Sequence, residues 1–449
     1  MAAIPKQELS LFDATCIIVG IIIGAGIYET APTVAQCLGS TTGVLVIWLV
    51  GGCLALAGAL CYAELATALP QAGGDYVYLT RAYGRQVGFL FGWSQLAVVR
   101  PGDIALMAFV FARYAQQLWP AAGLSRIAYA SMAVIVLTAV NIAGVSTGKW
   151  TQNILTAAKV LGMAMIIVVG FSAPTPPVPA ASPAPPSWGG FDLALILVMF
   201  TYGGWNEMAY VAAEIKNPRR NIVRGLVTGT VTVTVLYLLM NGAFIAALGL
   251  GPMAASPAVA VDTVARVFPA AAARGIAVLI CISALGAVNG LILTGARISY
   301  ALGADHRAFH LLGVWHPRLG TPVWSLVIQG AISLGIILLA GSFLDTIIYT
   351  APVVWLFFLG TGLAVFVLRR REPGLARPYR VPAYPLPPLL FSLCALFMLA
   401  SSASYAWHKV PWGLFLLALV LSSGALVYYL TEPPSPARPE EVRTNSDGH

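Results

Sequence analysis

The stretch Gly20-Ile21-Ile22-Ile23-Gly24-Ala25-Gly26-Ile27-Tyr28 interrupts the first long apolar segment of the chain with glycines, and Phe200-Thr201-Tyr202-Gly203-Gly204-Trp205-Asn206 interrupts a later one. Inside a bilayer, an unwound stretch leaves backbone N–H and C=O groups without helical partners, which is tolerated only where it is buried in protein or lines a cavity. Paired interruptions in two halves of a chain indicate a binding site. The freed N–H groups can hold a carboxylate and the freed carbonyls an ammonium. An amino acid carries both groups on one carbon.

The composition indicates an integral membrane protein. Of the 449 residues, 59% are hydrophobic and 9% are charged, whereas about a quarter of the residues of a soluble domain are charged. A spanning helix needs about 20 apolar residues. We therefore predict an all-α membrane protein with twelve spans, near residues 11–38, 42–69, 86–117, 126–145, 150–171, 191–213, 222–249, 274–302, 322–341, 343–368, 386–407 and 411–430.

The distribution of Lys and Arg predicts the orientation of these spans. With the N-terminus inside, 18 basic residues fall on inner segments and five on outer ends, while Arg100 and Lys159 lie within spans. We expect both termini to be cytoplasmic and the chain to lie in the cell (inner) membrane. The net charge of +8 then reflects the inner loops and does not indicate nucleic-acid binding.

The positions of the two interruptions predict an internal repeat. Gly26 and Gly204 are 178 positions apart, which fits an inverted repeat of five spans each, about 11–171 and 191–368. Two further helices follow, at about 386–430, so one transmembrane domain covers 1–431. We expect residues 432–449 to be a disordered cytoplasmic tail and residues 70–76 to form a turn before a short amphipathic segment.

Six runs of residues carry a resemblance to a known family. They are Gly24-Ala25-Gly26-Ile27, Gly58-Ala59-Leu60-Cys61-Tyr62-Ala63-Glu64-Leu65, Gly73-Gly74-Asp75-Tyr76, Arg100-Pro101, Ala157-Ala158-Lys159 and Tyr202-Gly203-Gly204-Trp205-Asn206. With these runs the chain resembles the amino acid–polyamine–organocation superfamily and, within it, the L-type amino acid transporter family. The resemblance implies a LeuT-type fold with helices 1 and 6 unwound at mid-membrane. It also implies sodium-independent movement of amino acids, often by exchange.

The first interruption is the predicted substrate clamp. By resemblance, the backbone around Ile22, Ile23, Gly24, Ala25 and Gly26 meets the carboxylate and the amine of the substrate. Glycine permits this close approach because it has no Cβ. The alternative is that the small residues serve only helix–helix packing. Many members of the family have serine at the position of Ala25, so here the carboxylate must rely on backbone N–H groups.

The second interruption supplies the rest of the predicted pocket. By resemblance, Phe200 covers the substrate from outside as a gate; the alternative is a core or lipid-facing side chain. Trp205 and Asn206 are expected to shape the floor. The remaining predicted contacts are Thr201, Gly203, Gly204 and Tyr28, whose hydroxyl could lie near the pocket.

Two glutamates, Glu29 and Glu207, each follow the last glycine of an interruption by three residues. A carboxylate there can cap a new half-helix. Ionisable groups at membrane depth are nevertheless usually functional. Proton coupling, ion pairing and recognition of a cationic substrate therefore remain open for both glutamates.

Lys159 is the strongest single candidate for coupling. It lies deep inside the fifth predicted span, too far from the surface to reach water easily. By resemblance its ammonium takes the place of a sodium ion and ties span 1 to spans 5 and 8, with Ser283 nearby. A plain buried ion pair is the alternative.

Other charged residues favour structural roles. Arg100 and Asp103 are three apart on one helical face and can pair, next to a kink at Pro101. Glu64 is expected to pair with an inner-loop cation. The run from Glu214 to Pro218 is expected to form a latch on the inner face.

No enzyme, metal or cofactor site is predicted. The chain has no nucleophile–base constellation, its six cysteines lack metal spacing, and His306 and His310 have no clear further ligands. The leading function is a transporter of amino acids by exchange or proton symport. The alternatives are a carrier of cationic amino acids or polyamines, and a non-transporting sensor or subunit. Animal light chains of the family that the chain resembles carry a cysteine in the outer loop after span 3, which forms a disulfide to a heavy chain. The corresponding loop 118–124 has no cysteine, so we expect no such disulfide and a monomer or homodimer.

Overall fold

The computed structural model describes residues 5–119, 124–174, 188–339, 351–409 and 411–431. Within these ranges the chain is helical, and the only β-type contacts are two isolated bridges. The elements are α1 (Leu11–Ile22), α2 (Gly26–Leu38), α3 (Thr41–Ala68), α4 (Asp75–Tyr83), α5 (Arg85–Ser94), η1 (Gln95–Val99), α6 (Arg100–Leu118), α7 (Arg126–Ile142), α8 (Val145–Ser172), α9 (Trp188–Thr201), η2 (Glu207–Glu214), α10 (Pro218–Leu248), α11 (Leu250–Ala255), α12 (Val259–Ala265), α13 (Ala272–Asp305), η3 (Arg307–Phe309), α14 (Val323–Leu339), α16 (Ala351–Arg371), α17 (Leu386–Lys409) and α18 (Pro411–Thr431).

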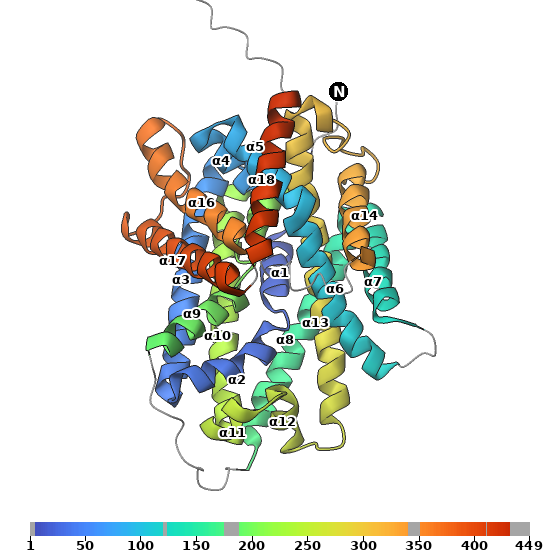
Figure 1. Cartoon of the computed structure of the whole chain (residues 1–449), viewed down its shortest axis with the longest axis vertical. Helices are drawn as coiled ribbons and strands as arrows, with labels where there is room; N and C mark the ends of the chain where they lie inside the picture. The colour runs from blue at the N-terminus through green and yellow to red at the C-terminus, as the bar shows by residue number, and fades with distance from the viewer. Residues whose placement is uncertain (1–4, 120–123, 175–187, 340–350, 410, 432–449) are drawn as a thin grey trace, which may run out of the picture.

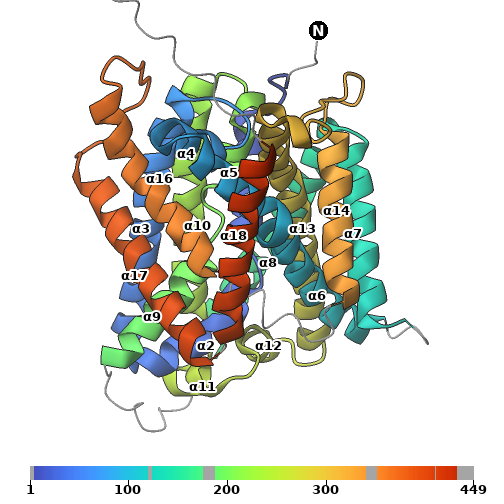
Figure 2. The ribbon, with the colours of Figure 1, turned by 45° about the horizontal axis from the view of Figure 1, so that its top comes forward.

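The helices form one bundle, with α4 near its upper end and α11 and α12 at its lower end (Figure 1). Seven helices in the described ranges are long and apolar enough to cross a membrane, or eight if α1 and α2 count as one bent span. Four shorter apolar helices accompany them. In α13 the most apolar window is 83% buried, the highest share among the long apolar helices of the described ranges. This helix packs against α6, α8 and α14 (Figure 2). The predicted tail 432–449 lies outside the described residues.

The first glycine-rich interruption breaks a helix as expected. Helix α1 ends at Ile22, α2 begins at Gly26, and the two are bent by 50°. At the start of α1, the Ser10 side chain accepts a hydrogen bond from the Asp13 N–H group, and the Asp13 carboxylate accepts one from the Ser10 N–H group. This reciprocal cap fixes the beginning of the helix.

The second interruption differs from its prediction on one side. Helix α9 ends at Thr201, residues 202–206 form turns, and the chain continues as the 3₁₀-helix η2 rather than as a regular α-helix. Gly204 has φ +108°, and a Cβ at that position would lie 2.7 Å from Cγ2 of Ile21. Only glycine combines this backbone with such close contact. The two interruptions therefore touch each other.

The predicted third span is also irregular. A π-helical turn, η1, separates α5 from α6 directly before Arg100 and Pro101. Proline has no N–H group and its ring clashes with the carbonyl four residues earlier. The wider π turn accommodates it, and such turns are frequent at functional sites.

The upper end of the bundle in Figure 1 is held by ion pairs and a backbone bridge. Glu64 accepts hydrogen bonds from both Nε and Nη2 of Arg369, which confirms its predicted pairing. Glu214 pairs with Arg297 at 2.8 Å. The N–H group of Leu9 donates to Glu214, and its carbonyl accepts from Lys216, each at 2.8 Å. The run that begins at Glu214 thus fastens the N-terminal segment. The short helix predicted after residue 70 is α4.

Candidate functional site

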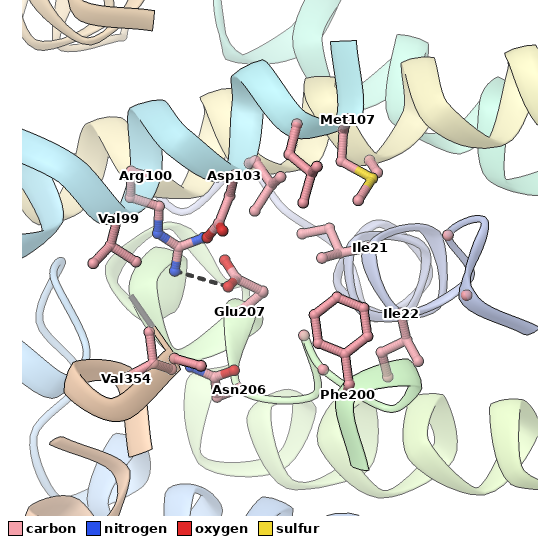
Figure 3. A pocket seen from close by; sticks show the side chains of 18 of the residues that line it. Ile21, Ile22, Val99, Arg100, Asp103, Met107, Phe200, Asn206, Glu207 and Val354 are labelled. Atoms are coloured by element: carbon pink, nitrogen blue, oxygen red, sulfur yellow. Dashed lines mark ion pairs between the residues drawn. The ribbon is translucent and has the colours of Figure 1, made fainter. Parts of the chain in front are cut away.

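A cavity of about 250 Å³ lies between the two helix breaks. Its wall is formed by the α1–α2 break, the α5–η1–α6 segment, the α9–η2 break, α13 and α16. Figure 3 shows the side chains of Arg100, Asp103 and Glu207 on one side of the cavity and those of Ile22 and Phe200 on the opposite side. The cavity is therefore charged at one end and apolar at the other.

The α1–α2 break presents free backbone donors beside this cavity. Among the described residues, no acceptor receives the N–H groups of Ala25, Gly26 and Ile27, although Tyr28 and Glu29 donate to the Ala25 carbonyl. Ala25 and Gly26 line the cavity. Three successive unpaired N–H groups at the start of a helix form a favourable environment for an anion.

The carbonyl groups of the same break are occupied by polar side chains. The ammonium of Lys159 donates to the carbonyl oxygens of Gly20, at 2.5 Å, and Ile23, at 3.0 Å. The Ser283 hydroxyl donates to the same Ile23 oxygen at 2.9 Å. This arrangement joins α1 to α8 and α13. Lys159 is completely buried, and no carboxylate pairs with it among the described residues. The plain buried ion pair is thus not what the structure contains.

Space for the Lys159 side chain is provided by a glycine on the facing helix. A Cβ on Gly286 of α13 would lie 2.7 Å from Cε of Lys159. The ammonium therefore fits only because the opposing helix has no side chain there.

Arg100 is at the centre of the charged end of the cavity. Its Nη2 atom lies 2.8 Å from Oε1 of Glu207, and its Nε donates to Gln95 at 3.0 Å. Thr294 of α13 donates to Oε2 of Glu207 at 2.6 Å. The sequence favours Asp103 as the partner of Arg100, whereas the ion pair in the structure is with Glu207. Glu207 therefore pairs across helices, and η2 has no side-chain cap.

A buried hydroxyl cluster connects this end of the cavity to α4. The guanidinium of Arg100 lies over the ring of Tyr210, 4.9 Å from its centroid. The Tyr210 hydroxyl donates to Asp75 at 2.7 Å, and the hydroxyls of Tyr62 and Thr361 donate to the same carboxylate. Asp75 is completely buried. It thus joins α3, η2, α4 and α16 at one point.

The structure places most of the predicted site residues at this cavity. Those that line it are Ile22, Gly24, Ala25, Gly26, Phe200, Thr201, Gly203, Gly204, Asn206 and Glu207. Ile23, Tyr28 and Trp205 are buried elsewhere. Trp205 packs edge-on against Tyr62 and Phe391. Glu29 is exposed and does not line the cavity.

Other helices contribute lining residues that the sequence alone did not assign. They are Phe91, Gln95, Val99, Asp103, Leu106 and Met107 from the segment around η1, Met199 and Tyr210 from the second break, Ala287 and Leu291 from α13, and Ala351, Val354, Trp355 and Phe358 from α16. The residues around η1 could not be assigned from the sequence, because the π turn changes the direction in which side chains point from that of a regular α-helix. In the described ranges, no group of three metal-binding side chains gathers.

Comparisons with known proteins agree with the motif-based resemblance. The family model for amino acid permeases matches residues 9–423. The b(0,+)-type amino acid transporter 1 of Mus musculus is 32% identical over 437 residues, which cover 94% of this chain and 88% of that protein. The serine/threonine exchanger SteT of Bacillus subtilis (strain 168) is 32% identical over 403 residues, or 88% of this chain and 91% of that protein. The large neutral amino acids transporter small subunit 2 of Mus musculus is 32% identical over 440 residues, with shares of 95% and 81%.

These matches extend over almost the whole chain, including both helix breaks and the cavity between them. The relatives are transporters rather than enzymes. Together with the long apolar helices, they identify a multi-pass membrane protein. The chain belongs to the amino acid permease family of the amino acid–polyamine–organocation superfamily.

Proposed function

We propose that this protein carries amino acids across the cell membrane without sodium, by alternating access to the cavity between the helix breaks. One observation carries the proposal. The N–H groups of Ala25, Gly26 and Ile27, which have no acceptor in the described ranges, lie at a break that lines a cavity between membrane helices. The relatives named above, all described as amino acid transporters or exchangers, support it.

The proposed topology has twelve spans in a LeuT-type arrangement, with inverted repeats at about 11–171 and 191–368. The seven clear spans, the bent α1–α2 pair and the four shorter apolar helices add up to twelve and support this count. Both termini lie in the cytoplasm, so α4 is on the inner side and α11 and α12 on the outer side. The protein functions in the inner membrane as a monomer or homodimer, without a disulfide-linked heavy chain.

In the proposed binding mode, the α-carboxylate of the substrate accepts hydrogen bonds from the free N–H groups at the start of α2. The α-amino group donates to carbonyl oxygens of the two breaks other than those of Gly20 and Ile23, which Lys159 and Ser283 already occupy. Lys159 replaces sodium, because its ammonium already neutralises the Gly20 and Ile23 carbonyl dipoles. No metal ion is then needed to hold the break in shape.

Alternating access requires a closure on each side of the cavity. We assign Phe200, whose ring lines the cavity and is 58% exposed, to the outer closure. The Asp75 hydroxyl cluster, the Glu214–Arg297 pair and the Leu9 bridge form the inner closure. Tyr210 contacts both the cavity and Asp75, so a substrate at Arg100 can influence the inner closure through it.

Uptake into proteoliposomes tests this function. Purified protein would be given labelled leucine, serine, alanine, lysine and putrescine, in sodium or choline buffer, at two pH values, with and without internal amino acid. Sodium-independent uptake of an amino acid is expected, and a strict need for sodium would contradict the role of Lys159. Dependence on internal amino acid indicates exchange, whereas uptake into empty vesicles that rises with an inward proton gradient indicates symport. Binding without uptake would identify a sensor, and uptake of putrescine alone a polyamine carrier.

A further inference from the structure

We infer that the cavity selects amino acids whose side chain is positively charged, and that Asp103 is the residue that recognises this charge. The inference rests on the proposed transport of amino acids and specifies the substrate class. It follows from the way in which the charged groups of the cavity are already paired.

The cavity wall contains one guanidinium and two carboxylates, those of Arg100, Asp103 and Glu207. Both oxygens of Glu207 are occupied, Oε1 by Arg100 and Oε2 by Thr294. The Arg100 guanidinium is engaged by Glu207 and Gln95. With these pairs formed, Asp103 is the carboxylate of the cavity wall without a direct partner among the described residues, and its ionised form would leave one net negative charge in the cavity.

Asp103 interacts electrostatically with Arg100 but has no hydrogen-bonded or ion-paired partner of its own in the part of the chain that the structure describes. In the described ranges, no hydrogen bond or ion pair within 4.0 Å involves its carboxylate, although it lines the cavity and keeps some solvent access. Its neighbours Leu106 and Met107 on the same helix are apolar. A carboxylate in such a wall is costly unless a cation comes to it. Asp75 provides a contrast, since three hydroxyl groups donate to its carboxylate and it does not line the cavity.

The position of Asp103 suits the side chain of a bound amino acid. In Figure 3 its carboxylate lies beside Arg100 and Glu207, across the cavity from Ile21 and Ile22 of the first break. A substrate held by its α-groups at that break extends its side chain across the cavity toward α6. Ala287 on the facing wall is small, which leaves room for an extended chain such as that of lysine, ornithine or arginine.

The same geometry decides between the carboxylates that the sequence offered for this role. Glu29 is exposed and lies outside the cavity, and Glu207 is committed to Arg100. Asp103, which the sequence analysis treats only as a partner of Arg100, is the one that remains available.

Arginine and citrulline provide the sharpest test, because they have nearly the same shape and differ in side-chain charge. Initial uptake rates of both, over a range of concentrations, would be measured in proteoliposomes of the wild type, Asp103→Asn and Asp192→Asn. Asp192 is an exposed carboxylate of α9 outside the cavity and serves as the matched control. In the wild type we expect a KM for arginine at least about tenfold below that for citrulline. Asp103→Asn should abolish this preference while citrulline uptake continues, and Asp192→Asn should preserve it.

Several results would overturn the inference. Equal KM values for arginine and citrulline in the wild type would overturn it. An equal decrease in the uptake of both amino acids by Asp103→Asn would also overturn it. Transport of neutral amino acids driven by a proton gradient, with arginine excluded, would assign Asp103 to a proton instead. Failure to transport any amino acid would reject the proposed function itself. This outcome differs from a failure of the inference alone, in which amino acids are still transported.

A second measurement covers the case in which Asp103→Asn does not fold. Asp103→Glu keeps the charge and should retain the preference for arginine. In detergent, arginine should raise the unfolding temperature of the wild type more than citrulline at the same concentration. The absence of any difference between the two would count against the inference.

Discussion

The hydroxyl group of Tyr237, on α10, lies 2.9 Å from the carbonyl oxygen of Ile22. The same hydroxyl lies 3.3 Å from the carbonyl oxygen of Thr201, so one side chain connects the last residues of α1 and α9. Both breaks therefore have a common polar contact behind the cavity, in addition to the direct contact between Gly204 and Ile21.

Tyr237→Phe should weaken transport without preventing folding. The substitution keeps the ring, which packs against Trp48 and Tyr202, and removes only the hydroxyl. A hydrogen bond contributes about 1 kcal/mol, or roughly a fivefold change, so we expect maximal uptake to fall by about that factor. Uptake per amount of reconstituted protein is the measurement. An unchanged rate would mean that the contact does not help to position the breaks.

Lys159→Ala should reduce uptake to below about a tenth of the wild-type rate, since the Gly20 and Ile23 carbonyls lose a charged donor. Lys216→Ala, which changes an exposed side chain outside the cavity wall, is the matched control and should transport normally. Partial rescue of Lys159→Ala by sodium would support the idea that the ammonium replaces an ion. Wild-type rates in the variant would refute it.

Phe200→Ala should impair transport more than it impairs expression. Its ring is 58% exposed and lines the cavity, so little packing energy is lost with it. Phe191→Ala provides the comparison, because Phe191 is an exposed ring on the same helix but is not part of the cavity wall. If both variants transport alike, Phe200 does not act as a gate.

Glu207→Gln should lower both uptake and the unfolding temperature, because it leaves the buried Arg100 without its counter-charge. Breaking a buried pair costs about 3–5 kcal/mol. We expect the pH profile of the remaining uptake to be unchanged, since the carboxylate is held by Arg100 and Thr294. Loss of the pH dependence would instead identify Glu207 as a proton carrier.

The control for Glu207→Gln is Glu372→Gln, which breaks the pair with Arg81, a residue whose side chain is 55% exposed. Exposed pairs contribute about 0–1 kcal/mol. This variant should therefore match the wild type in both uptake and unfolding temperature.

Gly204→Ala should destabilise the protein by about 1–3 kcal/mol and reduce uptake, since its φ of +108° is unfavourable for alanine and the new Cβ would meet Ile21. Gly335→Ala, in α14, has open space around the added Cβ and should be neutral or slightly stabilising. Thermal unfolding in detergent distinguishes the two. Equal unfolding temperatures would show that the breaks can separate without cost.

Sequence patterns were sufficient for the features that depend on local chemistry. Glycines marked the break between α1 and α2 and the end of α9, hydropathy predicted the long helices, and the depth of Lys159 indicated a buried polar contact. The pairing of Glu64 with a cation, Arg369, followed from its place at the end of a span.

Features that depend on packing between helices could not be predicted. The partner of Arg100 is Glu207, which is more than 100 positions away, and no local spacing identifies such a pair. The 3₁₀ conformation of η2 and the hydroxyl cluster around Asp75 likewise depend on neighbours from other helices. Helices α13 and α16, which contribute part of the cavity wall, are apolar around most of their circumference. Hydrophobic periodicity therefore does not identify the side of each helix that faces the cavity.

The π turn at Gln95–Val99 makes the number of residues in this helix as important as their identity. One residue of an α-helix corresponds to a rotation of about 100°. A π turn takes up one residue more than an α turn, so the same residues wound as a regular α-helix would turn Arg100 and Asp103 away from the cavity, with no change in hydropathy. A relative that lacks one residue here would regain a regular helix with the same side of α6 toward its substrate, whereas one that loses the π turn without losing a residue would present a different charge there.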